Sequence, residues 1–196
     1  KVVSWRCPRL FGGTHVTNAL EELGYECDAT YPMYFYNEQL FPYHPSQENW
    51  TEQGSLNLIE IIQFADMGME SKDDYGRDKD QWPLYRTQST EAFIPHIESF
   101  MSYLEKNDQS QKPIVLCFYF HPWEFWEMPE GVIHYGEGGV MPDPFLTKGC
   151  GKYCLNEVEL LIDWLKSKDA TFLTAGQCAR KWKNILAKPD IKRTQR

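Results

Sequence analysis

The sequence has too little positive charge and no apolar run long enough for several classes of protein. Its 20 Lys and Arg residues stand against 28 Asp and Glu, a net charge of −8. Nucleic acids and anionic membranes attract a basic face, so neither is an expected partner. No stretch approaches the roughly 18 apolar residues of a membrane span. The chain shows no signal peptide and begins with Lys1 rather than Met, so we expect coding sequence upstream of it.

Cysteine is also scarce. Six cysteines are too few and too scattered to indicate a disulfide framework in a chain of 196 residues. Cys150 and Cys154 form a Cys-x-x-x-Cys pair, but no second pair of Cys or His follows at zinc-finger spacing, so structural zinc is not predicted. A local disulfide and two free thiols are the alternatives for this pair. The redox environment and the compartment therefore stay open.

What the sequence does contain is an alternation of strand and helix patterns, which predicts an α/β fold with a mostly parallel sheet. A closed barrel of eight β/α units needs roughly 200 residues or more, and long loops occupy much of this chain. We therefore expect a partial or distorted (β/α) barrel with about five strands. It would form a single domain over residues 1–187, followed by a polar tail at 188–196. The predicted strands are 1–5, 25–28, 56–64, 113–120 and 170–173, and the predicted helices are 14–23, 91–107, 156–165 and 174–186.

Polar side chains follow or end several of these strands. Arg6 follows the first, Asp28 ends the second, and His121 follows the fourth; Glu60 lies within the third. Because the carboxyl ends of parallel strands meet at one rim, we expect Arg6, Asp28 and His121 to lie together. A nearby carboxylate favours the imidazolium that a general acid needs, and an arginine can fix a carboxylate in direction. Each residue also has a structural alternative: a rim salt bridge, a turn or a packed ring.

The order of short motifs along the chain resembles that of the polysaccharide deacetylases (carbohydrate esterase family 4). The resemblance covers nearly the whole chain, and the His-Pro-Trp-Glu form is similar to one bacterial and archaeal branch of that family. The motifs, in chain order, are Arg6-x-Pro8, Glu22-Leu23-Gly24-Tyr25, Asp28, Pro42-Tyr43-His44-Pro45-Ser46, Phe120-His121-Pro122-Trp123-Glu124 and Thr171-Phe172-Leu173-Thr174.

The resemblance implies a distorted (β/α) barrel of the deacetylase type. It implies a hydrolase that acts on carbon–nitrogen (non-peptide) bonds and removes acetyl groups from an acetylated sugar polymer or oligosaccharide, with a divalent metal such as Zn²⁺ in the complete protein. By resemblance His121 is the general acid, Asp28 orients it, and Arg6 partners an Asp base. The sugar groove would be lined by Pro8, Tyr31, Tyr43, Trp50 and Trp123, with core or loop packing as the alternative for the aromatic residues.

Two family motifs, which supply the Asp base and the metal ligands, are absent. Asp73-Asp74 lies in a polar loop rather than at a strand end, and His44 has Glu48 four residues on where a second histidine is needed. We therefore assign no metal ligand on this chain. Three explanations stay open: the missing strands lie upstream, another chain of an oligomer supplies them, or the protein binds glycans without cleaving them. A hydrolase of a small amide is a further alternative. The family slightly favours the cell envelope or exterior, without excluding the cytoplasm.

Overall fold

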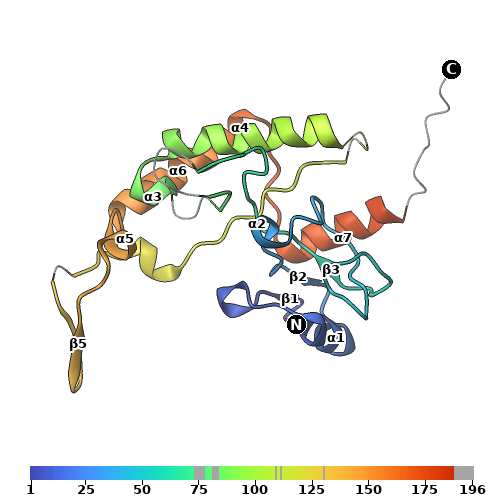
Figure 1. The fold of residues 1–196 in the computed structure, drawn as a ribbon, viewed down its shortest axis with the longest axis horizontal. Helices are drawn as coiled ribbons and strands as arrows, with labels where there is room; N and C mark the ends of the chain where they lie inside the picture. Colours follow the sequence, from blue (N-terminus) through green and yellow to red (C-terminus); the bar gives the residue numbers. More distant parts are fainter. Residues whose placement is uncertain (73–77, 81–83, 109, 111, 130, 188–196) are drawn as a thin grey trace. The chain divides into compact units, whose positions relative to one another are not determined.

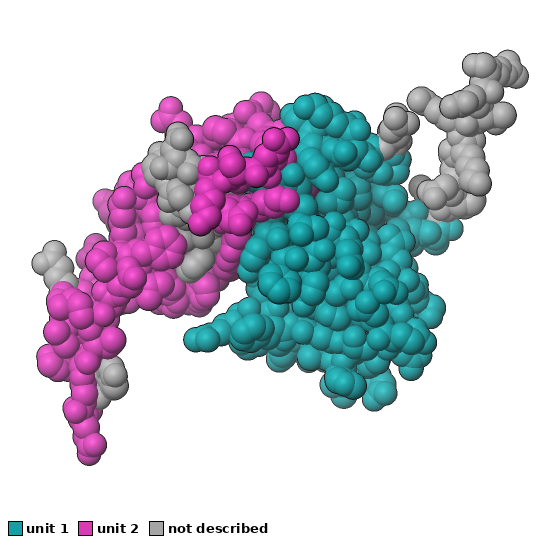
Figure 2. Space-filling view, in the orientation of Figure 1, with its two compact units in different colours: residues 1–67, 101–118, 172–196 teal, residues 68–100, 119–171 magenta. Residues whose placement is uncertain are grey.

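A computed structural model describes residues 1–72, 78–80, 84–108, 110, 112–129 and 131–187. The chain divides into two compact units (Figure 2), and the single domain expected over 1–187 stays a prediction. The first unit comprises residues 1–67, 101–118 and 172–196, and the second comprises 68–100 and 119–171. The division arises because the helices of the second unit pack against one another, with α3 (Leu84–Thr87) on α6 (Lys152–Ser167). The predicted tail at 188–196 lies outside the described residues.

The first unit is built on a small parallel sheet (Figure 1). Its strands lie in the order β1-β2-β3, and Cys27 in β2 pairs with Ser4 on one side and with Ile59 on the other. Two helices contact β2: α1, which lies between β1 and β2 in the sequence, and α7, which is the last element of the chain. The elements of this unit are β1 (Ser4–Trp5), η1 (Pro8–Leu10), α1 (Thr14–Glu22), β2 (Cys27–Asp28), α2 (Met33–Tyr36), β3 (Ile59–Glu60) and α7 (Ala175–Leu186).

The core of the first unit lies between the sheet and α7. Trp182, which is 1% exposed, packs with Cys27 and Ile59 and against the ring of Phe41. A capping box opens α7 at the predicted position: Gln177 N donates to Thr174 Oγ, and Thr174 N donates to the Gln177 side chain over 2.8 Å. Such a box satisfies backbone donors that the first turn leaves without partners, which explains where this helix begins.

The strands are shorter than the sequence predicts. Each strand of the parallel sheet spans two residues, and the segments 113–120 and 170–173 belong to no strand. Cys117 still accepts one backbone hydrogen bond, from Phe64 N over 2.9 Å. An apolar run becomes a strand only where a neighbouring backbone completes its ladder, and the apolar pattern carries no information about that neighbour. The described residues form a mixed α/β fold without a closed barrel.

The second unit is mainly helical. The predicted helix at 91–107 is confirmed as α4 (Thr90–Asn107), which tolerates Pro95 in its early turns and extends past Phe100 into the first unit. The helix expected from Asn156 begins earlier, at Lys152. The other elements are η2 (Pro122–Phe125), β4 (Ile133–Tyr135), β5 (Gly138–Val140) and α5 (Pro144–Thr147). Among the described residues no helix combines the length and the apolar character that crossing a membrane requires.

A β-hairpin forms between residues 133 and 140, where the sequence predicts neither strand nor helix. β4 and β5 pair antiparallel around the two-residue turn Gly136-Glu137, and the hairpin projects from the helices of its unit (Figure 1). Gly136 adopts φ 60°, which favours glycine in such a turn. The signal was present, because β-branched and aromatic residues flank a glycine-containing turn.

Candidate functional site

His121 lies in the second unit, directly before the short helix η2, where its ring is held by the carboxylate of Glu124. Glu124 Oε1 accepts from the backbone N of His121 over 2.7 Å and lies 3.0 Å from ring Nδ1. Pro122 at the first helical position suits this turn. Because a carboxylate can only accept, Nδ1 carries the hydrogen in this arrangement.

Glu124 is itself fixed by buried donors. Its Oε2 accepts from the Tyr85 hydroxyl over 2.5 Å and from Arg86 Nε over 3.1 Å, and the side chains of Glu124 and Arg86 are both 0% exposed. The Arg86 guanidinium also donates to the carbonyls of Phe145 and Lys148. Burial and the hydrogen bond to Glu124 raise the pKa of Tyr85 well above its ordinary value, so that its hydroxyl stays a donor. Four donors therefore hold one buried carboxylate in place.

The imidazole of His121 reaches the surface while its partner does not. Its side chain is 44% exposed, and its ring stacks on Trp123 with centroids 5.3 Å apart. The Arg86 guanidinium lies 5.5 Å from the Trp123 ring centroid. We call His121, Glu124, Arg86, Tyr85 and Trp123 the His121 network. An accessible imidazole on a rigid carboxylate is the arrangement of a general acid or base.

Sequence reasoning assigned two members of this network, His121 and Trp123, and no role to the other three. Glu124 had a signal, because a carboxylate three residues after the residue that precedes a helix commonly bonds back to the backbone. Arg86 and Tyr85 had none, since they lie where the sequence predicts neither strand nor helix, about 35 residues before the histidine.

Gly149 lies against the Arg86 backbone and should not accept a larger residue. It adopts φ +70°, and an added Cβ would meet the carbonyl oxygen of Arg86. We expect Gly149→Ala to lower the free energy of unfolding by about 1–3 kcal/mol, measured by urea denaturation. Gly131→Ala is the control, because Gly131 has φ +79° with nothing within 4 Å of the added Cβ. Equal losses in the two variants would contradict the predicted clash.

The first unit holds a second polar cluster around Arg6 and Asp28. Arg6 donates to the carbonyl of Ala29 over 2.9 Å, to the carbonyl of Phe118 over 3.3 Å and to Cys117 Sγ over 3.1 Å. Asp28 is fully buried and accepts from the Thr30 hydroxyl. The structure therefore brings Arg6 and Asp28 to one end of the sheet, as predicted. Arg6 acts there mainly as a clamp on backbone carbonyls.

Glu60 supports the same sheet end. Ile61 N donates to Asp28 O and Gln63 N donates to Tyr31 O, so three residues on one strand oppose two on the other, as in a bulge. The N–H groups of Thr30 and Tyr31 donate instead to Glu60 Oε1, over 3.0 and 2.8 Å. Glu60 is fully buried. The sequence placed it in a strand but gave no sign that it satisfies a neighbouring backbone.

Burial changes the proton affinity of both carboxyls. It raises the pKa of Asp28 to about 6, although the Thr30 hydrogen bond and the Arg6 charge act in the opposite direction. Burial and, after it, the neighbouring Asp28 charge raise the pKa of Glu60 well above its ordinary value. These two carboxyls therefore hold protons to a higher pH in the folded protein than in an unfolded chain.

A pH dependence of stability follows from Asp28. Its ordinary pKa is 3.8 and its folded-state pKa is about 6, so the folded state binds the proton more tightly. The resulting stability is fully present below the lower value and is lost as the pH rises through the higher one. We expect the wild type to lose roughly 1–3 kcal/mol between these pH values relative to Asp28→Asn, measured by urea unfolding. Asp163→Asn is the control, because Asp163 is exposed and its loss should leave the pH dependence of the wild-type stability unchanged. Stability curves of the wild type and Asp28→Asn that run parallel against pH would contradict the prediction.

The aromatic residues expected to line a sugar groove are mostly core residues. Tyr31, Tyr43 and Trp50 are 0%, 1% and 5% exposed, and the Tyr31 ring contacts both others at centroid distances of 5.8 and 5.7 Å. The Tyr43 hydroxyl donates to the carbonyl of Trp50 over 2.7 Å. The structure thus shows the packing alternative for these three, because edge-to-face ring contacts and burial remove their faces from solvent. Pro8, in contrast, is exposed in η1.

The side chains that the structure describes do not fit the expected divalent metal. In those residues no group of three or more His, Cys, Asp or Glu is arranged to hold an ion. Asp73-Asp74 lies outside the described residues. All six cysteines are free thiols, which decides between the alternatives for Cys150 and Cys154 in this structure.

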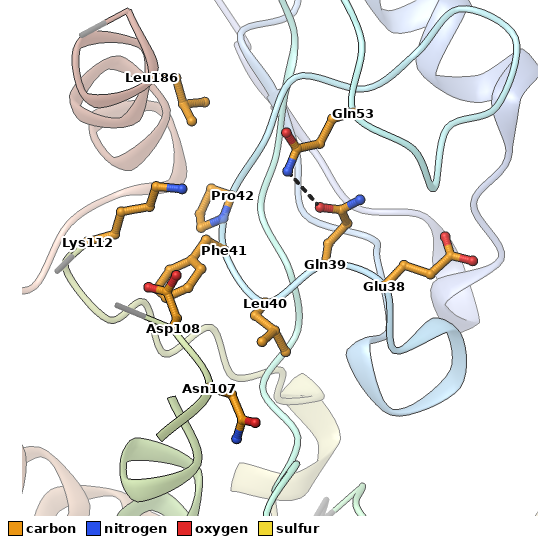
Figure 3. Close-up of a pocket in the computed structure, with 10 residues that line it drawn as sticks. All are labelled: Glu38, Gln39, Leu40, Phe41, Pro42, Gln53, Asn107, Asp108, Lys112 and Leu186. Atoms are coloured by element: carbon orange, nitrogen blue, oxygen red, sulfur yellow. Dashed lines mark hydrogen bonds between the residues drawn. The ribbon is translucent and has the colours of Figure 1, made fainter. Parts of the chain in front are cut away.

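A pocket of about 210 Å³ in the first unit is lined by none of the predicted site residues (Figure 3). Gln39 and Gln53 on its wall bond to each other over 3.1 Å, and Lys112 Nζ lies 5.7 Å from the Phe41 ring centroid. Ligand pockets usually measure about 300–1,000 Å³. This pocket is therefore smaller than the usual small-molecule site, and two of its polar side chains are already hydrogen-bonded to each other.

The three residues predicted to share a site divide between the units. Arg6 and Asp28 belong to the first unit and His121 to the second, where Glu124 holds its ring. The orientation of His121 by Asp28 stays a prediction. Comparisons with protein-family models, with curated proteins and with solved structures find no match.

Proposed function

We propose that this chain supplies the proton-donating part of a hydrolase that removes acetyl groups from acetylated amino sugars. The observation that carries the proposal is the half-exposed His121 ring, whose Nδ1 lies 3.0 Å from the fully buried Glu124 carboxylate. Carboxylate–imidazole pairs of this kind fix the tautomer of a catalytic histidine and stabilise its protonated form. The motif resemblance supplies the substrate class.

The residues of this chain account for one step. When the acetyl carbon–nitrogen bond breaks, the departing amine nitrogen takes a proton from Nε2 of His121, and Glu124 stabilises the ring while it is charged. Trp123, stacked beside the imidazole, offers a flat face against which a sugar ring can pack. No described residue set fits the metal, so we assign neither water activation nor carbonyl polarisation to this chain.

The test is acetate release by the complete gene product, measured on N-acetylglucosamine oligomers. O-acetylated xylan, scored for acetate, and a set of small linear and cyclic amides, scored for amide hydrolysis, form two further arms. We expect release from the amino-sugar oligomers, with His121 required for it. Turnover of the small amides alone would replace this proposal by the amidohydrolase alternative. No release from any substrate, with or without added Zn²⁺, would reject the hydrolase proposal.

A second candidate function is glycan binding without cleavage. It is favoured by the lack of a metal-capable group among the residues that the structure describes. Calorimetric titration of the complete protein with the same oligomers distinguishes the two. Binding without acetate release would support this candidate, and acetate release that depends on His121 would exclude it.

A further inference from the structure

Asp28 and Glu60 are paired neighbours on adjacent strands. The register aligns Asp28 in β2 with Glu60 in β3, and the two strands are parallel. Paired residues of neighbouring strands lie about 5 Å apart at Cα and direct their side chains to the same face of the sheet. Two carboxyl groups therefore share a fully buried position, since both side chains are 0% exposed.

Each carboxyl has one oxygen with donors and one oxygen without. Asp28 Oδ1 accepts from the Thr30 hydroxyl, and Glu60 Oε1 accepts from two backbone N–H groups. Within the part of the chain that the structure describes, Asp28 Oδ2 and Glu60 Oε2 are buried acceptors with no donor. A buried acceptor without a donor is costly, and so is a pair of adjacent buried negative charges.

We propose that Asp28 and Glu60 hold one proton between them in the folded protein. The neutral carboxyl donates its O–H to the ionised one, so that Oδ2 and Oε2 become donor and acceptor. This single hydrogen bond satisfies both oxygens at once. The pair then carries one negative charge, which the Arg6 guanidinium balances, since Arg6 is the cation that acts on both carboxyls.

The other titratable groups around the pair stay neutral. Cys27 lies on the same strand as Asp28, Cys7 follows β1, Cys117 contacts Arg6, and Tyr31 and Tyr43 lie beside Glu60 in the connecting segments. Burial raises the pKa of each of these thiols and phenols, to about 12 for Cys27 and Tyr31. None of them supplies a competing charge near pH 7, so the charge balance involves Arg6 and the two carboxyls.

The shared proton has a positioning role. It lets Glu60 remain buried while Oε1 holds the backbone of Thr30 and Tyr31, and it fixes Asp28 at the sheet end beside Arg6. This inference does not depend on the proposed hydrolase function, and its test uses no enzyme activity.

The experiment is a carboxyl ¹³C NMR titration of the complete protein, with Asp and Glu side chains labelled. A shared proton requires Asp28 and Glu60 to titrate together in two separated steps. In Glu60→Gln the neighbouring charge is absent and the amide donates to Asp28, so we expect Asp28 to titrate in one step that begins at lower pH. Glu157→Gln, which replaces another buried carboxylate, is the control and should leave both curves unchanged.

An unchanged Asp28 titration in Glu60→Gln would overturn the proposal. If Glu60→Gln does not fold, infrared spectroscopy on the wild type gives a second test. The proposal requires a carbonyl stretch of a neutral carboxylic acid at pH 7 whose frequency changes in Asp28→Asn, where the ionised partner is lost, but stays the same in Glu157→Gln. Absence of that band in the folded wild type would equally overturn it.

Discussion

Replacing His121 by alanine is expected to lower the rate of acetate release by the complete protein by a factor of roughly 10²–10⁴, the usual contribution of a general acid. The ring is half exposed, so the fold should survive the change, and circular dichroism with urea unfolding would verify this. The rate should be measured under single-turnover conditions on N-acetylglucosamine oligomers, so that the chemical step is observed.

The matched control is His134→Ala. His134 is an exposed histidine of the same unit, in β4 and outside the His121 network, so its removal should leave acetate release unchanged. Glu124→Gln should also lower the rate, because it removes the charge that stabilises the protonated ring while preserving the size of the side chain. Full activity in His121→Ala would reject the assignment of His121 as the acid.

Replacing Arg86 by methionine is expected to lower the free energy of unfolding by roughly 3–5 kcal/mol, because it leaves the Glu124 charge buried without its cation. Both side chains are 0% exposed, so water cannot replace the lost partner. The change also removes donors from the carbonyls of Phe145 and Lys148. Urea unfolding of the second unit within the complete protein measures the effect.

A double variant separates loss of the ion pair from loss of packing. Arg86→Met combined with Glu124→Gln removes the uncompensated charge while preserving an acceptor for Tyr85, so it should be more stable than Arg86→Met alone. Lys168→Met provides the control, because Lys168 and Glu98 form an exposed pair at 3.9 Å whose loss should change stability by less than about 1 kcal/mol. A loss below about 1 kcal/mol in Arg86→Met itself would contradict the structural role of this pair.

The helices followed from the sequence where local patterns define them. The helices predicted at 14–23 and 174–186 are α1 and α7; apolar residues recur at helical spacing from Val16 in the first, and a capping box of Thr174 and Gln177 begins the second. Both signals act within one or two turns of a helix, so they need no knowledge of the rest of the chain. The start of α6 at Lys152 was missed, because Gly151 and not Asn156 precedes its first turn.

The candidate sites divide in the same way. His121 and Asp28 could be singled out because His121 follows one predicted strand and Asp28 ends another. Their partners could not: Arg86 meets Glu124 across nearly 40 positions of sequence, and Glu60 meets Asp28 only through strand register. The sequence indicated which side chains could take part in acid–base chemistry, but not which neighbouring groups would hold them or change their proton affinity.

By itself, then, the sequence determined the helices with strong local signals. It also led us to expect no nucleic acid or anionic membrane as a partner and to single out His121 for acid–base chemistry. The tertiary structure alone decided which apolar runs became strands, that Tyr31, Tyr43 and Trp50 are core residues, and which carboxylate holds His121. The physical reason is that caps and helical periodicity are local, whereas strand pairing, burial and ion pairing depend on residues that the fold brings together from distant parts of the chain.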